Sequence, residues 1–272
     1  MSISEQRFAA SLVEKARSKT GIAIAGVFLF AVVFTLTNPI PQDPVYHQFA
    51  DAQRIFSVPN FWNVASNLPF LLVGIWGLII VCGRRQQPTV LRPVYAAFFF
   101  GVLLTAFGSG FYHFAPANQP LVWDRLPMTI AIAGLFAAVI GEYESHSLGR
   151  RLLVPFLAIG ALSVFYWHWT ELRGVGDLRP YAIVQFLPML VIFVLLIMRG
   201  PASSLTRSLW WMVGFYFFAK IFEHFDAQIY ALFPLSGHTL KHLFAALGPA
   251  ALAVGLRQRN LKPVANAGSH HK

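Results

Sequence analysis

Long apolar runs constrain this chain more than any other feature of its sequence. Eight stretches of roughly twenty residues hold few charged side chains, and they cover residues 21–37, 62–82, 93–114, 124–140, 152–169, 180–198, 208–227 and 238–256. A helix of about twenty apolar residues crosses the hydrocarbon core of a bilayer. Only 12% of the residues are charged, about half the share found in soluble domains. The sequence therefore predicts an all-α integral membrane protein.

The positive charge is distributed as in a membrane protein and not as in a nucleic-acid-binding protein. The net charge of +10 is carried by short segments between the apolar runs, so we expect no nucleic-acid partner. Fifteen Lys and Arg residues fall on one side of the predicted membrane, and three fall on the other, namely Arg54, Arg173 and Arg179. Basic residues concentrate in cytoplasmic loops, so both termini are predicted to be cytoplasmic.

The apolar runs divide the chain into five segments. Residues 1–20 are predicted to form a basic cytoplasmic or interfacial tail. Residues 21–37 form an additional N-terminal transmembrane helix, since no small-residue cleavage site of a signal peptide follows them. A Pro-rich extracytoplasmic linker at 38–61 leads into a seven-helix core at 62–256, and 257–272 is a basic cytoplasmic tail.

Five polar residues are predicted to lie at the same membrane depth. Ser109 and His113 lie near the outer end of run 93–114, Asp124 opens the next run, and His238 and His242 open the last. Ionisable groups within a bilayer are costly and usually functional. Because the topology follows from Lys and Arg alone, the meeting of all five on the extracytoplasmic side is an independent indication of a site.

The spacing of these residues is typical of a metal site. Residues four apart share one face of a helix, which pairs Ser109 with His113 and makes His238 and His242 an H-x3-H pair like those that chelate zinc. A single His in a helix is more often a packing residue, but three His side chains at one depth favour metal binding. A three-His site leaves the fourth tetrahedral position to water, which is the catalytic pattern.

Other polar residues are predicted to support this site. Asn63, Ser66 and Asn67 lie on one face of run 62–82 and are interpreted as interhelical hydrogen-bond partners. Glu223 and Asp226 are candidates to orient the histidine pair as hydrogen-bond acceptors. A local ion pair with Lys220 is the alternative for this acidic cluster.

Four strings together indicate a known family. They are NFWNVASNLPF at 60–70, S-x3-H at 109–113, WDRLPM at 123–128 and HTLKH at 238–242. Over residues 51–256 the chain resembles the alkaline ceramidase family, within a wider group of seven-helix membrane hydrolases that includes the progestin/adipoQ receptors. The resemblance implies a zinc ion held by His113, His238 and His242, with Ser109 and Asp124 beside it.

The resemblance also implies the reaction. The chain is expected to be a zinc-dependent intramembrane amidase that hydrolyses ceramide or a related N-acyl lipid to a sphingoid base or amine and a fatty acid. Asp124 is the candidate general base, and Ser109 is placed to hydrogen-bond the developing oxyanion. The alternative is a zinc-containing lipid receptor without turnover. A transporter is disfavoured, since it would place acidic residues near the midplane.

The chain departs from the family pattern at two places. Eukaryotic members carry an acidic calcium-binding segment before the FWN string, where this chain has DAQRIFSVPNFWN. Asp51 remains, but Asn60 replaces a Glu and Arg54 adds a positive charge. Calcium prefers several oxygen ligands, usually carboxylates, so no calcium site is expected. Arg125 also stands where a Glu is usual.

Overall fold

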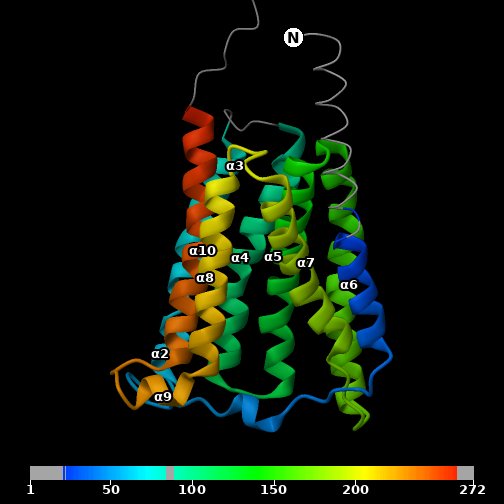
Figure 1. Ribbon diagram of the computed structural model, residues 1–272. Helices are drawn as coiled ribbons and strands as arrows, with labels where there is room; N and C mark the ends of the chain where they lie inside the picture. The colour runs from blue at the N-terminus through cyan, green and yellow to red at the C-terminus, as the bar shows by residue number, and fades with distance from the viewer. Residues whose placement is uncertain (1–20, 22, 84–88, 262–272) are drawn as a thin grey trace, which may run out of the picture.

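The computed structural model describes residues 21, 23–83 and 89–261. An N-terminal helix that includes Ala23–Thr35 comes first. The other elements follow in the order η1 (Pro44–His47), α2 (Phe61–Ala65), α3 (Leu68–Cys82), η2 (Thr89–Leu91), α4 (Arg92–Phe114), α5 (Asn118–Tyr143), α6 (His146–Leu172), α7 (Arg179–Arg199), α8 (Thr206–His224), α9 (Asp226–Tyr230) and α10 (Gly237–Leu261) (Figure 1). Within these ranges the only β pairing is an isolated bridge between Ile55 and Val58. The predicted tail at 1–20, the residues 84–88 and residues 262–272 of the predicted C-terminal tail lie outside the described residues. The first part of that predicted tail, residues 257–261, is helical and belongs to α10.

Six helical segments are long and apolar enough to cross a membrane. They are α2 with α3, η2 with α4, α5, α6, α7 and α10. Their outward faces expose large apolar side chains such as Leu72, Phe107 and Leu162. Lipid tails are as apolar as these side chains, so contact with the bilayer does not destabilise the protein. The chain is therefore a nearly all-helical, multi-pass membrane protein.

Two helices that were predicted to cross the membrane are not among these six. α8 carries Arg207, Lys220 and Glu223 within its 19 residues, and charged side chains at the centre of a spanning helix are unfavourable. The described apolar helix Ala23–Thr35 is shorter than a full span. The predicted count of a seven-helix core with one additional helix stays a prediction.

The helix boundaries differ from the sequence prediction at three places. The run 62–82 is divided into α2 and α3, because Pro69 at the start of α3 lacks a backbone N–H and starts a new helix. The run 208–227 is divided between α8 and the short α9. Asp124 lies in the second turn of α5 and not at its start, since the polar residues from Asn118 onward are already helical. Hydropathy marks membrane depth and not the beginning of a helix.

One end of the bundle collects all the predicted site residues. α4 ends there, α5 and α10 begin there, and the segment before α2 crosses the same end at the bottom of Figure 1. A Cβ at Gly108 would overlap the Trp123 carbonyl oxygen, so only glycine allows α4 and α5 to approach this closely. This approach brings Ser109 on α4 next to Asp124 on α5.

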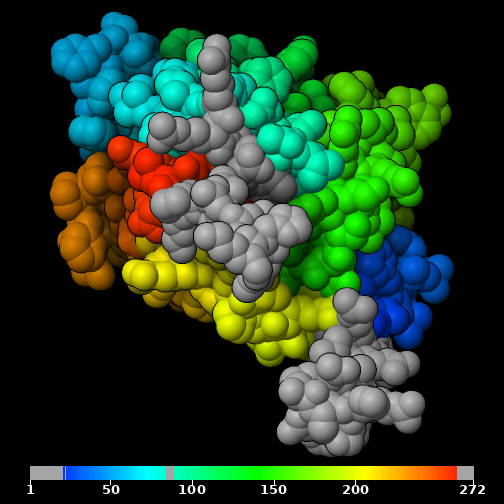
Figure 2. All heavy atoms as spheres, turned by 90° about the horizontal axis from the view of Figure 1, so that it is seen from above, coloured from blue at the N-terminus to red at the C-terminus, as the bar shows by residue number. Residues whose placement is uncertain are grey.

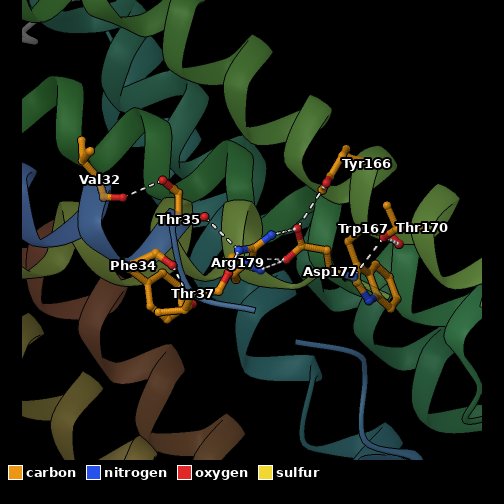
Figure 3. A network of polar contacts seen from close by, with 9 residues as sticks. All are labelled: Val32, Phe34, Thr35, Thr37, Tyr166, Trp167, Thr170, Asp177 and Arg179. Carbon is orange, nitrogen blue, oxygen red and sulfur yellow. Dashed lines mark hydrogen bonds and ion pairs between the residues drawn. The ribbon is translucent and has the colours of Figure 1, made fainter. Parts of the chain in front are cut away.

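The N-terminal helix lies at the edge of the molecule. It runs beside α6, away from α10, both in the side view and in the view from above (Figures 1 and 2). Its end is fixed by Arg179 at the start of α7, which donates to the carbonyl oxygens of Thr35 and Thr37 (Figure 3). Asp177 holds the Arg179 guanidinium at 2.8 Å and accepts from Tyr166. The Arg179 guanidinium lowers the pKa of Asp177, which keeps this contact charged.

Candidate metal centre

Three histidine side chains converge where α4 ends and α10 begins. His113 lies in the last turn of α4, and His238 and His242 lie in the first two turns of α10. All three are buried. The His113 Nε2 atom is 3.2 Å from His242 Nε2 and 3.3 Å from His238 Nε2. The structure thus brings together the three histidines that were predicted as metal ligands, and their ligand nitrogens all lie within 4.8 Å of one another.

These separations suit a tetrahedral metal ion. With zinc–nitrogen distances of about 2.0–2.1 Å, two nitrogen ligands of a tetrahedron stand about 3.3 Å apart. A neutral imidazole has one N–H and one lone pair, so three ring nitrogens aimed at one point are stabilised better by a cation than by one another. The buried His113, His238 and His242 group can thus bind a metal ion.

Ser66 fixes the tautomer of one imidazole. The Ser66 Oγ atom lies 2.8 Å from His242 Nδ1 and donates its own hydrogen to the Asn63 carbonyl oxygen at 3.2 Å. The hydroxyl oxygen therefore accepts the proton on Nδ1, which leaves the Nε2 lone pair of His242 free for a metal. Sequence reasoning gave Ser66 a general supporting role and missed this direct contact, which depends on the break between α2 and α3.

Ser109 and Asp124 lie beside the histidines. Both are buried, and both line a cavity whose wall also includes His242. The Ser109 hydroxyl is within hydrogen-bonding reach of the Asp124 carboxylate. A carboxylate, a hydroxyl and a potential metal ligand thus border one cavity.

A lid covers the histidines from outside the bundle. We use this name for residues 42–50, which include η1. The ring of Phe49 lies 4.7 Å from the rings of His113 and His238. His47 attaches the lid to the bundle through Tyr112 at 3.0 Å and Asn118 at 2.9 Å. Sequence reasoning missed both lid residues, because one Phe among 26 and one loop histidine carry no distinguishing pattern.

The side-chain amides of the two predicted asparagines bond to groups other than the imidazoles. Asn63 joins α2 to α10, because its Oδ1 accepts from the Thr239 hydroxyl at 2.9 Å. Its Nδ2 donates to the Asp51 carbonyl oxygen at 3.2 Å, which joins α2 to the segment before it. Asn67 stays within its own turn and donates to the Asn63 carbonyl oxygen at 2.8 Å. Of the three polar side chains on this face, that of Ser66 is hydrogen-bonded to a histidine, and the backbone of Asn63 also bonds to His242.

The two predicted acidic residues also lie outside contact with the imidazole rings. Glu223 forms ion pairs with Lys220 at 2.7 Å and with Lys241 at 3.0 Å, so the local ion pair considered from the sequence is present. Asp226 accepts the backbone N–H of His238 at 2.7 Å and that of Ala50 at 3.0 Å. Asp226 therefore positions the start of α10 and the lid through the backbone.

A cavity leads from these residues into the bundle. Its volume is about 380 Å³, and its walls come from α4, α5, α7, α8 and α10. Much of the remaining lining is apolar and includes Phe98, Val102, Leu135, Met189 and Met212, while Arg125, Lys220, Glu223 and Lys241 add charged groups to the wall. A polar head with a long apolar interior matches the shape and chemistry of an acyl lipid.

Comparison with known families now decides the assignment. A sequence model of the family described as Ceramidase matches residues 51–225, which is more than half of the chain. The chain belongs to the ceramidase family. Ceramidases hydrolyse the amide bond of ceramide, so membership implies a membrane hydrolase with a lipid substrate and does not favour the receptor alternative. A search among curated proteins found no match.

The matched region of this ceramidase-family protein does not include the whole site. It contains Ser109, His113 and Asp124, but it ends before α10, which carries His238 and His242. The completion of the three-histidine group therefore depends on the fold, and the short distances between the ring nitrogens support it independently of the family match.

The residues before α2 make some contacts within the protein, although Oδ2 of the Asp51 carboxylate has no hydrogen-bond partner among the described residues. The Asp51 carboxylate is buried, and its Oδ1 accepts the Gln53 backbone N–H at 3.0 Å. Asn60 uses its Nδ2 to donate to the His113 carbonyl oxygen at 2.8 Å. Asn60 thus supports the helix end that carries a histidine of the site.

Proposed function

We propose that this ceramidase-family protein is a zinc-dependent intramembrane amidase that cleaves ceramide or a related N-acyl lipid. The observation that carries the proposal is the convergence of three buried imidazole Nε2 atoms at the head of an apolar cavity. His113, His238 and His242 would hold the ion. Zinc in such a site supplies a nucleophilic hydroxide near neutral pH and polarises the amide carbonyl.

The residues of the chain would divide the remaining work. The apolar cavity wall binds the acyl chain and places the amide beside the histidines. Asp124 takes a proton from the attacking water and delivers it to the leaving nitrogen as the C–N bond breaks. Ser109 donates a hydrogen bond to the oxygen on which negative charge develops. The Phe49 ring excludes bulk water from the histidines, which strengthens the electrostatic interactions within.

The test of this proposal is lipid turnover by the purified, zinc-loaded protein. We expect the protein to release fatty acid and amine from mixed ceramides and N-acyl lipids. Mass spectrometry measures the products. A receptor with the same zinc content would bind the lipid and release no fatty acid, which would contradict the amidase.

We also propose a topology of eight crossings with the catalytic core at 62–256, both termini cytoplasmic and the site facing the extracytoplasmic side. The fifteen-to-three distribution of basic residues supports it. The functional residues at the end where α10 begins would then be reached from the periplasm or lumen.

The orientation is tested by cysteine labelling in intact cells. The native Cys82 is replaced by Ser, and single cysteines are placed at Gln119, which is exposed at the site end, or at Ser147, which is exposed in the first turn of α6. We expect an impermeant maleimide to label the cysteine at 119 and not the one at 147. The reverse pattern would place the site on the cytoplasmic side.

Calcium is expected to be dispensable. Activity should persist when calcium is chelated in a zinc-buffered solution, because Asn60 is a donor to His113 and Arg54 adds a positive charge nearby. The measurement is fatty-acid release at fixed free zinc with and without free calcium. A loss of activity that calcium restores would show a calcium site at Asp51.

A further inference from the structure

A buried arginine lines the cavity beside the proposed general base. Arg125 follows Asp124 on α5 and is 5% exposed. Its guanidinium carbon stands 4.0 Å from the centre of the Trp167 ring and 4.6 Å from that of Tyr181. Its Nη2 donates to Gln42 Oε1 of the lid at 2.5 Å. Nothing in the proposed hydrolysis uses this group.

The charge of Arg125 has no acidic partner in the part of the chain that is described. None of the ion pairs there includes it, and its buried Nη1 has no hydrogen-bond partner. The nearby Glu171 is used differently, since it accepts from the Gln42 backbone N–H at 2.6 Å and from Trp167 Nε1 at 3.1 Å. Buried charges in proteins are normally paired, so a buried guanidinium without an acidic partner, on a residue that lines a cavity, indicates a site for an anion.

The rest of the cavity makes Arg125 the distinctive cation. Lys220 and Lys241 also line it, but Glu223 pairs with both. Arg125 stands at the lid end, with Gln42 and Tyr181, whereas the apolar lining lies deeper among the helices. With an acyl chain in the apolar part and the amide at the histidines, the amine portion of the substrate faces Arg125.

We propose that Arg125 binds an acidic group on the amine portion of the substrate, so that the preferred substrate is an N-acyl lipid whose amine part carries a carboxylate or a similar anion. This inference rests on the proposed amidase function for its direction of binding. A planar guanidinium suits a carboxylate because two parallel N–H groups meet two oxygens. The Trp167 and Tyr181 rings hold the guanidinium plane in place for this contact.

The test compares two ligands that differ only in charge. N-dodecanoylglycine carries a carboxylate, and N-dodecanoylglycinamide carries a neutral amide of the same size. With zinc-loaded wild-type protein we expect kcat/KM to favour the acid. Arg125→Gln should lower the ratio of acid to amide about 10- to 100-fold, the range for losing a hydrogen bond to a charged group. Arg173→Gln is the matched control, since Arg173 lies over Trp169 at 4.2 Å outside the cavity, and its ratio should equal that of wild type.

A binding measurement separates this inference from the amidase proposal. Thermal stabilisation by each ligand is measured in Asp124→Asn protein, with and without Arg125→Gln, so no turnover is needed. Acid binding that depends on Arg125 without fatty-acid release by the wild type would contradict the amidase and keep this inference.

Two results would overturn the inference about Arg125. The first is release from both lipids at equal kcat/KM, which leaves the amidase proposal intact. The wild type is enough to show this result if the Arg125→Gln variant does not fold. The second is Arg125-dependent binding of free dodecanoic acid, with no difference between the two glycine lipids, which would assign Arg125 to the released fatty acid.

Discussion

Asp124→Asn should reduce fatty-acid release per bound zinc about 100-fold or more, the usual range for losing a positioned acid–base group. The substitution keeps the size of the side chain and one hydrogen-bonding oxygen, so Ser109 retains a partner, but an amide takes no proton near neutral pH. Zinc content and thermal stability should stay close to wild type. The measurement is release of fatty acid from a ceramide and from an N-acyl lipid, divided by zinc content from elemental analysis.

A distant carboxylate supplies the control for this experiment. Glu144→Gln makes the same chemical change at the opposite end of the bundle, where Glu144 pairs with Arg199 at 2.6 Å, and it should leave release per zinc unchanged. Equal release per zinc in Asp124→Asn and wild type would remove Asp124 from the mechanism. A loss of zinc in step with activity would instead give Asp124 a structural role.

Removing two of the three histidines should abolish both metal binding and turnover. In the double variant His238→Ala, His242→Ala only His113 remains, and a single imidazole does not retain zinc against a chelating buffer. We expect about one zinc per wild-type chain and almost none in the variant. The melting temperature should also fall, because a metal that binds only the folded state stabilises it.

A histidine outside the group serves as the control. His224 lies in the last turn of α8 and is exposed, so His224→Ala should keep its zinc. Near-full zinc content in the double variant, measured by elemental analysis after gel filtration, would rule out the three-histidine centre.

Much of the helical arrangement could be predicted from the sequence, because a bilayer imposes simple rules on a chain. Length and hydropathy located every helix from α3 to α10 except the short α9. The division between α2 and α3 could not be predicted, because Pro69 is also compatible with a kinked but continuous helix. The prediction that α8 crosses the membrane stays a prediction, because the helix carries Lys220 and Glu223. Glu223 pairs with Lys241 of α10, and a contact between two helices cannot be read from one stretch of sequence.

The site was predictable to the extent that it follows a periodic spacing. The i, i+4 rule on two helices led to His113, His238 and His242, and the common membrane depth added Ser109 and Asp124. Contacts that depend on loop conformation were not accessible. Phe49 reaches the histidines because the lid crosses the bundle end. The sequence marks Arg125 only as a departure from the family pattern, because its contacts with Trp167 on α6 and Tyr181 on α7 depend on how the helices pack.

The two backbone contacts of Asp226 have a mechanical consequence. One carboxylate holds Ala50 of the lid and His238 at the start of α10, so the cover of the site and the helix that supplies two of its nitrogens are coupled. Any motion that lifts the lid pulls on the same anchor that keeps His238 aligned with His113. We therefore expect the three histidines to keep their alignment best while the lid is closed.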